Sequence, residues 1–350
     1  MSKFLGMKES GVIIPTIVLL IAVQIINPIF LSGENIINIL RSSSFTLMTA
    51  LGMTFVMIAG GIDLSVGSVV GIGGVITGIA LTHNLPIFVG VLLGILTGVV
   101  IGYINGYIIT KFKIAPLMMT LGTLYIARGI IYVLTQGVPV YPLPEAFEQM
   151  EQGYFLSIPM VCWISFILAG IAYLMLTQTT FGRSVYAVGG NPEAARLSGI
   201  KVRNINYAIY AMCGGLSATT GVFMASRLGS AQAGAGTGFE LTVVAAVVIG
   251  GTSTFGGSGT ILGTIIGVLF TNLLANSMTI LKISIYWQSL IIGLVLVLAV
   301  IVDGYKRKKS IAGWKPFKEK QNVYIGNAGD DKKVWKFNCT EQSELESKTK

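Results

Sequence analysis

The sequence predicts an all-α integral membrane protein with about ten transmembrane helices, and three observations support this fold class. Of the 350 residues, 53% are hydrophobic and only 11% are charged, whereas a soluble domain carries roughly 25% charged residues. Apolar runs long enough to cross about 30 Å of hydrocarbon recur along the chain. Glycine recurs within these runs at helical spacing, which is typical of closely packed membrane helices.

Ten apolar runs are bounded by polar residues or by Gly and Pro, and each is expected to form one span. They cover residues 11–31, 43–60, 64–82, 87–110, 115–135, 158–177, 206–226, 241–256, 260–277 and 284–302. The second, third, eighth and ninth are short and interrupted by glycine, so one pair of them could be broken or re-entrant helices. The first run has no small-residue cleavage site after it, so we expect a retained helix behind a short N-terminal segment, 1–10.

Basic residues gather in the segments that alternating spans place on one side of the membrane. These residues are Lys3, Lys8, Lys111, Lys113, Arg183, Arg196, Lys201, Arg203 and the run 306–309. Segment 137–157, on the opposite side, contains three glutamates and no Lys or Arg. Because cytoplasmic loops are enriched in Lys and Arg, the loop 178–205 and both termini are predicted to be cytoplasmic in a multi-pass plasma-membrane protein.

The net charge of +9 therefore indicates membrane topology and contact with anionic lipid. No aromatic-basic nucleic-acid motif occurs, and nucleic acid is not an expected partner. Cys162, Cys213 and Cys339 lack the spacing of a disulfide framework or a metal site. No metal and no cofactor are expected.

Two glycine-rich segments resemble each other, namely 60–68 (GGIDLSVGS) and 250–258 (GGTSTFGGS). Each joins two short apolar runs, as an internal repeat in a transporter would, although the match leaves the relative orientation of the halves open. Glycines at intervals of three or four residues in 67–78 and 90–106 share one helix face in each segment and are expected to pack against neighbouring helices.

The polar segment from Thr177 to Asn206 contains the start and stop signals of a short helix. Asn191 suits the N-cap position, Pro192 the first helical position and Glu193 the first turn, while Gly199 marks the end. We expect a slim helix on the cytoplasmic side that could enter a groove on another protein. A plain connecting loop is the alternative.

The pattern Glu-Ala-Ala followed by three residues and Gly, at 193–199, resembles the coupling motif of permeases in ATP-binding cassette (ABC) importers. Segments 60–68, 181–200, 236–241 and 245–253 together resemble the ribose-type sugar permeases, which include ribose, xylose, arabinose and galactoside transporters. The resemblance runs from about residue 30 to 303. It implies an importer permease that works by alternating access and carries a simple sugar, ribose or another pentose.

The resemblance also implies a set of partners: a second permease chain in a homodimer, a cytoplasmic ATP-binding subunit and an extracytoplasmic sugar-binding protein. It assigns coupling to the ATPase to one group of residues, Glu193, Ala194, Ala195, Arg196 and Gly199. The chain itself is expected to be a transport subunit and not an enzyme, because no Gly-x-x-x-x-Gly-Lys-Ser/Thr phosphate loop occurs in it.

Few polar side chains in the spans are suited to a pathway for an uncharged, hydroxyl-rich solute. The candidates for the pathway or its gating are Asp63, Ser65, Asn105, Glu240 and Asn272. Asp63 is expected first of all to cap the following helix, and Glu240 to begin a helix. Arg128 and Arg227 are expected to snorkel to the membrane surface or to contact a docked binding protein.

Three domains of the chain follow: the N-terminal segment 1–10, a permease domain 11–302 and a polar cytoplasmic tail 303–350, for which the composition predicts disorder. Two other functions stay open. An ion-coupled secondary carrier would usually show intramembrane carboxylates or histidines, and the single histidine, His83, lies in a predicted loop. A membrane receptor or scaffold without a transport cycle is the second alternative.

Overall fold

A computed structural model describes residues 10–313. Residues 10–307 belong to one compact unit, and 308–313 are the described part of a second unit that continues to residue 350. The described α-helices are α1 (Ser10–Ile26), α2 (Gly33–Ile58), α3 (Val66–Thr82), α4 (Ile87–Phe112), α5 (Pro116–Thr135), α6 (Glu145–Gln152), α7 (Met160–Gln178), α8 (Thr180–Gly190), α9 (Pro192–Leu197), α10 (Val202–Leu228), α11 (Phe239–Ile249), α12 (Ile261–Ile280) and α13 (Ile285–Gly313). A 3-10 helix η1 (Pro28–Leu31) and a hairpin of β1 (Tyr154–Phe155) and β2 (Ile158–Pro159) complete the described elements.

The all-α membrane fold is confirmed. Six described helices are long and apolar enough to cross a membrane, namely α2, α4, α5, α7, α10 and α12. Shorter apolar helices lie in α1, α3, α11 and α13. Each of the ten predicted spans overlaps one of these ten helices, while α6, α8 and α9 lie in the predicted polar segments. Most of the predicted tail lies outside the described residues, and helix α13 continues through its first part to Gly313.

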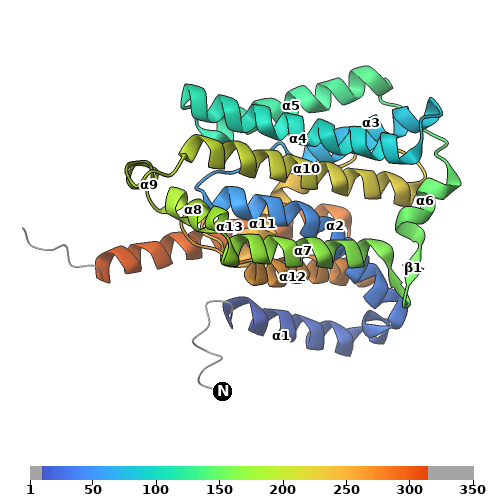
Figure 1. The fold of residues 1–350 in the computed structure, drawn as a ribbon. Coiled ribbons are helices and arrows are strands. Elements are labelled where there is room, and N and C mark those ends of the chain that lie inside the picture. The colour runs from blue at the N-terminus through green and yellow to red at the C-terminus, as the bar shows by residue number, and fades with distance from the viewer. Residues whose placement is uncertain (1–9, 314–350) are drawn as a thin grey trace, which may run out of the picture. The chain divides into compact units, whose positions relative to one another are not determined.

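Helices α2 and α10 form the centre of the first unit. In an apolar stretch of 18 residues of α2, 83% of the residues are buried, compared with 22% in the corresponding stretches of α4 and α5. Helix α10 packs along α4, α3 and α2, and α2 also contacts α7 and α12; Figure 1 shows α4, α10 and α2 side by side in that order. The outward faces of α4 and α5 are exposed and apolar, as faces in contact with lipid would be.

Glycine makes the contact between α4 and α10 possible. A Cβ added at Gly98 would lie 2.5 Å from the Cβ of Ala218, and one added at Gly106 would lie 2.9 Å from the carbonyl oxygen of Asn206. No other side chain leaves room for such close helix backbones. The predicted packing face of α4 is therefore confirmed. By contrast, a Cβ at Gly122 or Gly129 on α5 would meet no atom within 4 Å.

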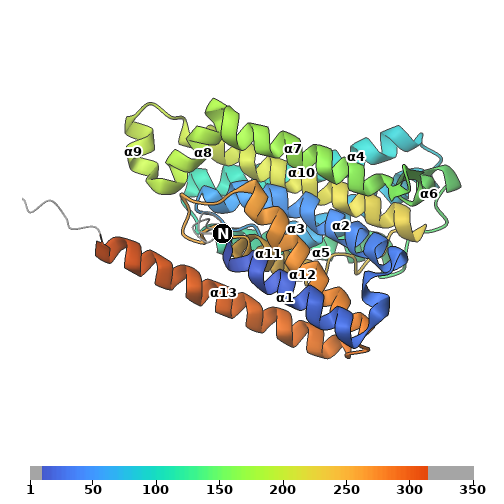
Figure 2. The ribbon, with the colours of Figure 1, turned by 90° about the horizontal axis from the view of Figure 1, so that it is seen from below.

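The ends of the bundle differ in chemistry. One end carries α9, and the other carries α6 and the hairpin (Figures 1 and 2); we call them the α9 end and the α6 end. Lys113 lies near enough to Glu193 of α9 to interact with its charge. The basic segments 111–113 and 183–203 thus share the α9 end, and the acidic segment 145–151 lies at the α6 end.

A buried ion pair fastens α6 to α2. The Nε of Arg41 lies 2.9 Å from Oε1 of Glu151, whose side chain is fully buried. The backbone N–H of Glu151 donates to Oγ of Ser226 on α10, at 3.2 Å. Burial raises the pKa of Glu151, while the charges of Arg41 and Arg227 act in the opposite direction. Glu151, which the sequence placed in a plain acidic loop, is an interior residue of the α6 end.

Of the four short predicted spans, the eighth is a half-helix. Helix α11 has 11 residues and is about 16 Å long at 1.5 Å per residue, too short to cross the hydrocarbon. Turns at residues 229–238 precede it. The helix stops at Ile249, short of the predicted boundary at 256, because Gly251 takes a left-handed backbone conformation with φ of 90°. The second and ninth spans are continuous helices, α2 and α12.

Candidate functional site

Helix α9 forms as its sequence predicts. The side chain of Asn191 accepts hydrogen bonds from the backbone N–H groups of Glu193 and Ala194, each at 3.0 Å, and Pro192 occupies the first turn. Gly199 follows with φ of 84°, and the N–H of Ile200 then donates to the carbonyl oxygen of Ala195 at 3.0 Å. These caps fix the position of a helix of only six residues.

The outer face of α9 is open to a partner. Ala195 is buried against the bundle, whereas Glu193, Ala194 and Arg196 are exposed. Leu197 is also exposed, with 76% of its surface accessible, and the sequence pattern did not single it out. Such an apolar side chain beside small and charged neighbours suits a protein contact.

Glu193 and Arg196 form an exposed ion pair one helical turn apart, with 2.5 Å between Oε1 and Nη2. The hydrogen bond and charge of Arg196 lower the pKa of Glu193. An exposed pair of this kind adds little to stability. It does fix the direction of both side chains on the outer face of α9.

Helix α8 leads into α9 and packs on the end of α2, just before the first glycine-rich segment, and on the loop of the second one. A Cβ added at Gly189 would lie 2.7 Å from the backbone nitrogen of Gly257. The N–H of Gly257 donates to the carbonyl oxygen of Ile58, at 2.8 Å, and the hydroxyl of Tyr186 donates to the carbonyl oxygen of Gly259, at 2.7 Å. The ends of α2, α8 and the 250–259 loop thus meet at one junction.

Asp303 of α13 holds the same loop. Its Oδ2 accepts hydrogen bonds from the N–H of Thr254 at 3.0 Å, from the Thr254 hydroxyl at 3.0 Å and from the Ser253 hydroxyl at 3.3 Å. The sequence indicated Asp303 only as the start of the tail. Its carboxylate instead fixes a turn next to the junction below α9.

Three of the predicted pathway residues form one buried polar chain. Oδ1 of Asp63 accepts from the N–H of Ser65 at 2.9 Å and from its hydroxyl at 2.5 Å. Asn105 on α4 donates to the Ser65 hydroxyl at 3.0 Å, and Thr123 on α5 donates to Oδ1 of Asn105 at 2.6 Å. Residues far apart in sequence thus join the segment before α3 to α4 and α5.

Asp63 differs in one respect from the prediction. It accepts a backbone N–H, as expected, but the N-cap of α3 is Ser65, which makes no side-chain cap hydrogen bond. Asp63 lies two residues earlier and bonds within a tight turn of its own. Helix α3 therefore begins at Val66, two residues later than it would if Asp63 were its N-cap.

Glu240 and Asn272 are not members of this chain of hydrogen bonds, but Glu240 lies close to it, because a Cβ added at Gly67 would touch its Oε2. Glu240 lies in the first turn of α11, the helix-start position predicted for it. Asn272 on α12 donates to the carbonyl oxygen of Val268 at 2.9 Å and accepts from the Thr46 hydroxyl of α2 at 3.4 Å. In this conformation Asn272 connects two helices.

Arg128 on α5 binds the non-helical half of the broken span, which the sequence reading missed. Its Nη1 donates to the carbonyl oxygens of Ala233 at 3.0 Å and Ala235 at 2.8 Å. The guanidinium is half-buried and held by these carbonyls, a role that the expectation of snorkelling did not include; its depth in the membrane stays a prediction. Backbone groups freed by a missing half-helix need such donors within a membrane.

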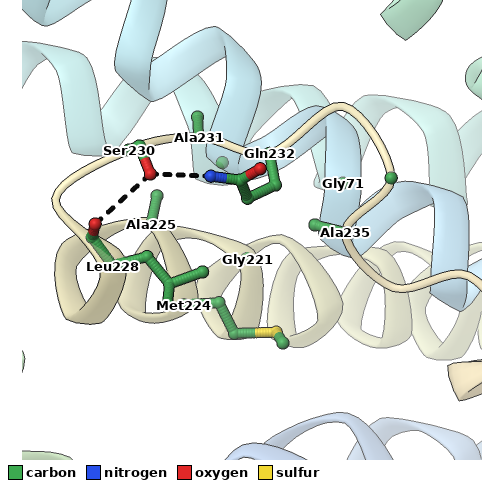
Figure 3. A pocket seen from close by; sticks show the side chains of 11 residues that line it. Gly71, Gly221, Met224, Ala225, Leu228, Ser230, Ala231, Gln232 and Ala235 are labelled. Atoms are coloured by element: carbon green, nitrogen blue, oxygen red, sulfur yellow. Dashed lines mark hydrogen bonds between the residues drawn. The ribbon is translucent and has the colours of Figure 1, made fainter. Parts of the chain in front are cut away.

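A cavity of about 330 Å³ lies between α3, α10 and this non-helical segment (Figure 3). Small residues of both helices, including Gly71 and Gly221, form one side of it. Ser230 and Gln232 of the segment line the other side, and Nε2 of Gln232 donates to the Ser230 hydroxyl at 2.8 Å. All the residues that line the cavity are uncharged.

Comparisons with known proteins agree with this architecture. Residues 35–300 match the family model described as branched-chain amino acid transport system / permease component. The chain is 42% identical over 307 residues to the ribose import permease protein RbsC of Haemophilus influenzae, covering 87% of this chain and 95% of that protein. It is 42% identical over 306 residues to RbsC of Bacillus subtilis, covering 87% and 94%.

A third relative is the L-arabinose transport system permease protein AraH of Escherichia coli, 38% identical over 300 residues, which cover 86% of this chain and 92% of AraH. No solved structure gave a significant match. The extent of these similarities, over helices that the structure arranges as a membrane bundle, shows that the chain belongs to the branched-chain amino acid transport system / permease component family and to its ribose-type ABC permeases.

Proposed function

We propose that this chain is the membrane-spanning subunit of an ABC importer that carries a pentose, with ribose as the first candidate, into the cell by alternating access. The observation that carries this proposal is the 42% identity to ribose import permeases along 95% of the length of one of them. The arabinose permease at 38% supports the same substrate class with a different member.

The exposed face of α9 supports an ATP-binding subunit as the partner at the α9 end. The helix is capped at both ends, and its small and charged residues stand outside the bundle together with Leu197. In this proposal Glu193, Ala194, Arg196 and Leu197 contact the ATPase directly. Ala195 and Gly199 shape the helix that presents them.

The proposed orientation follows from charge. The basic segments at the α9 end are cytoplasmic under the positive-inside rule, and the α6 end then faces the sugar-binding protein outside. A second copy of the chain completes the pathway as a homodimer, and lipid covers the apolar faces of α4 and α5. The polar chain of Asp63, Ser65 and Asn105 then joins the start of α3 to α4 within the spans.

The junction of α2, α8 and the 250–259 loop would transmit movement from the ATPase to the spans. Closure of the ATPase dimer would displace α9, and α8 would transmit the displacement through Gly189 to the ends of α2 and the 250–259 loop, which touch there. Alternating access requires that both repeats move together, and this junction contacts both. No catalytic residue of this chain takes part, because ATP hydrolysis belongs to the partner.

A reconstituted complex tests the substrate class. The permease, its ATPase and its binding protein would be placed in proteoliposomes, and competition of ribose, arabinose, xylose and galactose against labelled ribose would be measured. We expect a pentose to compete at the lowest concentration. Stronger competition by galactose, a hexose, would contradict the pentose assignment, and inhibition by a branched-chain amino acid such as leucine, added as a fifth competitor because of the family description, would contradict the sugar class.

A further inference from the structure

The cavity beside the broken span has features of a ligand site. Its volume of about 330 Å³ lies within the range of small-molecule pockets, roughly 300–1,000 Å³. One wall is formed by Gly71, Gly74 and Gly221, whose missing side chains let α3 and α10 approach closely: a Cβ added at Gly74 would lie 2.8 Å from the carbonyl oxygen of Gly221. Met224 and Leu228 add apolar contact surface.

The opposite wall offers hydrogen bonds that the protein does not use. Ser230 donates to the carbonyl oxygen of Leu228 at 3.2 Å and accepts from Gln232 at 2.8 Å (Figure 3). Within the described residues, Oε1 and the second N–H of Gln232 make no hydrogen bond. A carboxamide with one free acceptor and one free donor can bind a vicinal pair of hydroxyl groups.

The lining selects against ions. No charged side chain contributes to it, so a cation or anion would lose its hydration without compensation. A neutral ligand with apolar C–H faces and several hydroxyls matches both walls. Monosaccharides have this combination.

Hydrogen bonds fix both ends of the segment 230–235, which lines the cavity. At the α6 end, Val140 and Ala231 exchange two backbone hydrogen bonds, each 3.0 Å long. Toward α11, Arg128 holds the carbonyl oxygens of Ala233 and Ala235. The cavity therefore lies between the α6 end and the half-helix, beside an interrupted span of the kind from which transporters typically build substrate sites.

We infer that this cavity is a low-affinity subsite for a neutral, polyhydroxylated ligand of monosaccharide size, with Gln232 and Ser230 as its hydrogen-bonding groups. The inference rests on the proposed function for the identity of the ligand that reaches it. A sugar released at the α6 end would meet this cavity before it reached α11.

Two substitutions test the subsite in the reconstituted complex. Gln232→Leu removes the free amide. Gly234→Leu adds bulk at a lining position where a Cβ would meet no atom within 4 Å, so the fold can accept it. We expect each variant to lower ribose uptake about tenfold while the ATPase rate stimulated by sugar-loaded binding protein stays at the wild-type level.

Two variants outside the lining are matched controls. Thr237→Ser changes the same segment but keeps the hydroxyl that donates to the carbonyl oxygen of Gly234, and Gly170→Leu adds the same bulk on α7, where a Cβ also meets no atom within 4 Å. Both should transport normally. Wild-type uptake by both cavity variants would overturn the inference, as would a parallel loss of uptake and ATPase stimulation, which indicates a structural role.

A direct binding measurement separates this inference from the proposed function. In a Cys339→Ser background, Gly234→Cys would be labelled with a thiol reagent in the presence and absence of ribose; it lines the cavity and keeps both hydrogen-bonding side chains intact, while Cys162 and Cys213 are buried. We expect ribose to slow labelling of Gly234→Cys and to leave labelling of Thr237→Cys unchanged. Protection without sugar uptake by the wild-type complex would support the subsite and contradict the importer, whereas uptake without protection would contradict the subsite alone.

Discussion

The backbone N–H of Gly257 donates a hydrogen bond to the carbonyl oxygen of Ile58, with 2.8 Å between nitrogen and oxygen. This bond joins the loop of the second glycine-rich segment to the end of α2, immediately before the first segment. Gly189 of α8 packs on the same point. Because α8 leads into α9, the junction is where a force on α9 would reach the end of α2 and the 250–259 loop together.

Gly189→Ala should disturb this junction, whereas Gly190→Ala should not. A Cβ at Gly189 would lie 2.7 Å from the nitrogen of Gly257, and a Cβ at Gly190 would meet no atom within 4 Å. Overpacking of this kind costs about 1–3 kcal/mol. We expect a lower melting temperature in detergent and weaker uptake for Gly189→Ala only; equal behaviour of the two neighbouring variants would contradict the junction.

Glu193→Ala and Gly199→Val should uncouple transport. The first removes the exposed carboxylate of α9, and the second places a β-branched side chain at φ of 84°, where it is strained. We expect normal membrane insertion but loss of binding-protein-stimulated ATPase activity and of uptake. Glu145→Ala, an exposed glutamate at the α6 end, is the matched control and should keep ATPase docking intact.

Arg128→Gln should loosen the broken span. It leaves the carbonyl oxygens of Ala233 and Ala235 without the guanidinium donor, and each buried group that loses its partner costs about 1–3 kcal/mol. Faster proteolysis within residues 229–238 is the expected result. Arg183→Gln, at an exposed arginine of α8, should leave the cleavage rate unchanged; an equal effect of both changes would contradict the role of Arg128.

Arg41→Gln should give a pH-dependent loss of stability. It leaves the buried carboxylate of Glu151 without its ion-pair partner, which typically costs about 3–5 kcal/mol. Burial already raises the pKa of Glu151, and removal of Arg41 raises it further. Since the folded state then binds a proton more readily than the unfolded state, stability should recover as the pH falls toward and below the folded pKa.

Melting temperatures between pH 8 and pH 5 would measure this effect, with Arg41→Gln/Glu151→Gln as the control. The double variant carries no buried charge at this position, so its difference from the wild type should vary less with pH. A deficit of Arg41→Gln that stays constant over this range would contradict the assignment.

The sequence predicted those features that depend on local chemistry. Apolar runs identified the spans, and the signals at Asn191, Pro192 and Gly199 predicted α9 because caps and backbone conformations act within a few residues. The bond from Asn105 to Ser65, which links Asp63 to α4, was not predictable in the same way. It depends on the packing of α3 against α4, which no local pattern specifies.

Arg128 illustrates the same limit. Its carbonyl partners lie 105 and 107 positions along the chain, and hydropathy alone favours the membrane surface for an arginine near a span end. The half-helix α11 explains why the interior could accept this charge, since it leaves carbonyl groups free to bind it. Likewise, the exposure of Leu197 follows from the orientation of α9, which the composition of the segment does not reveal.

The source of energy tests the central claim most directly. Uptake of labelled ribose into proteoliposomes would be measured with and without ATP, the ATPase subunit and the binding protein, and in the presence of ionophores that collapse proton and sodium gradients. The account predicts uptake that requires all three components and persists with the ionophores. Uptake by this chain alone that follows an ion gradient would contradict it.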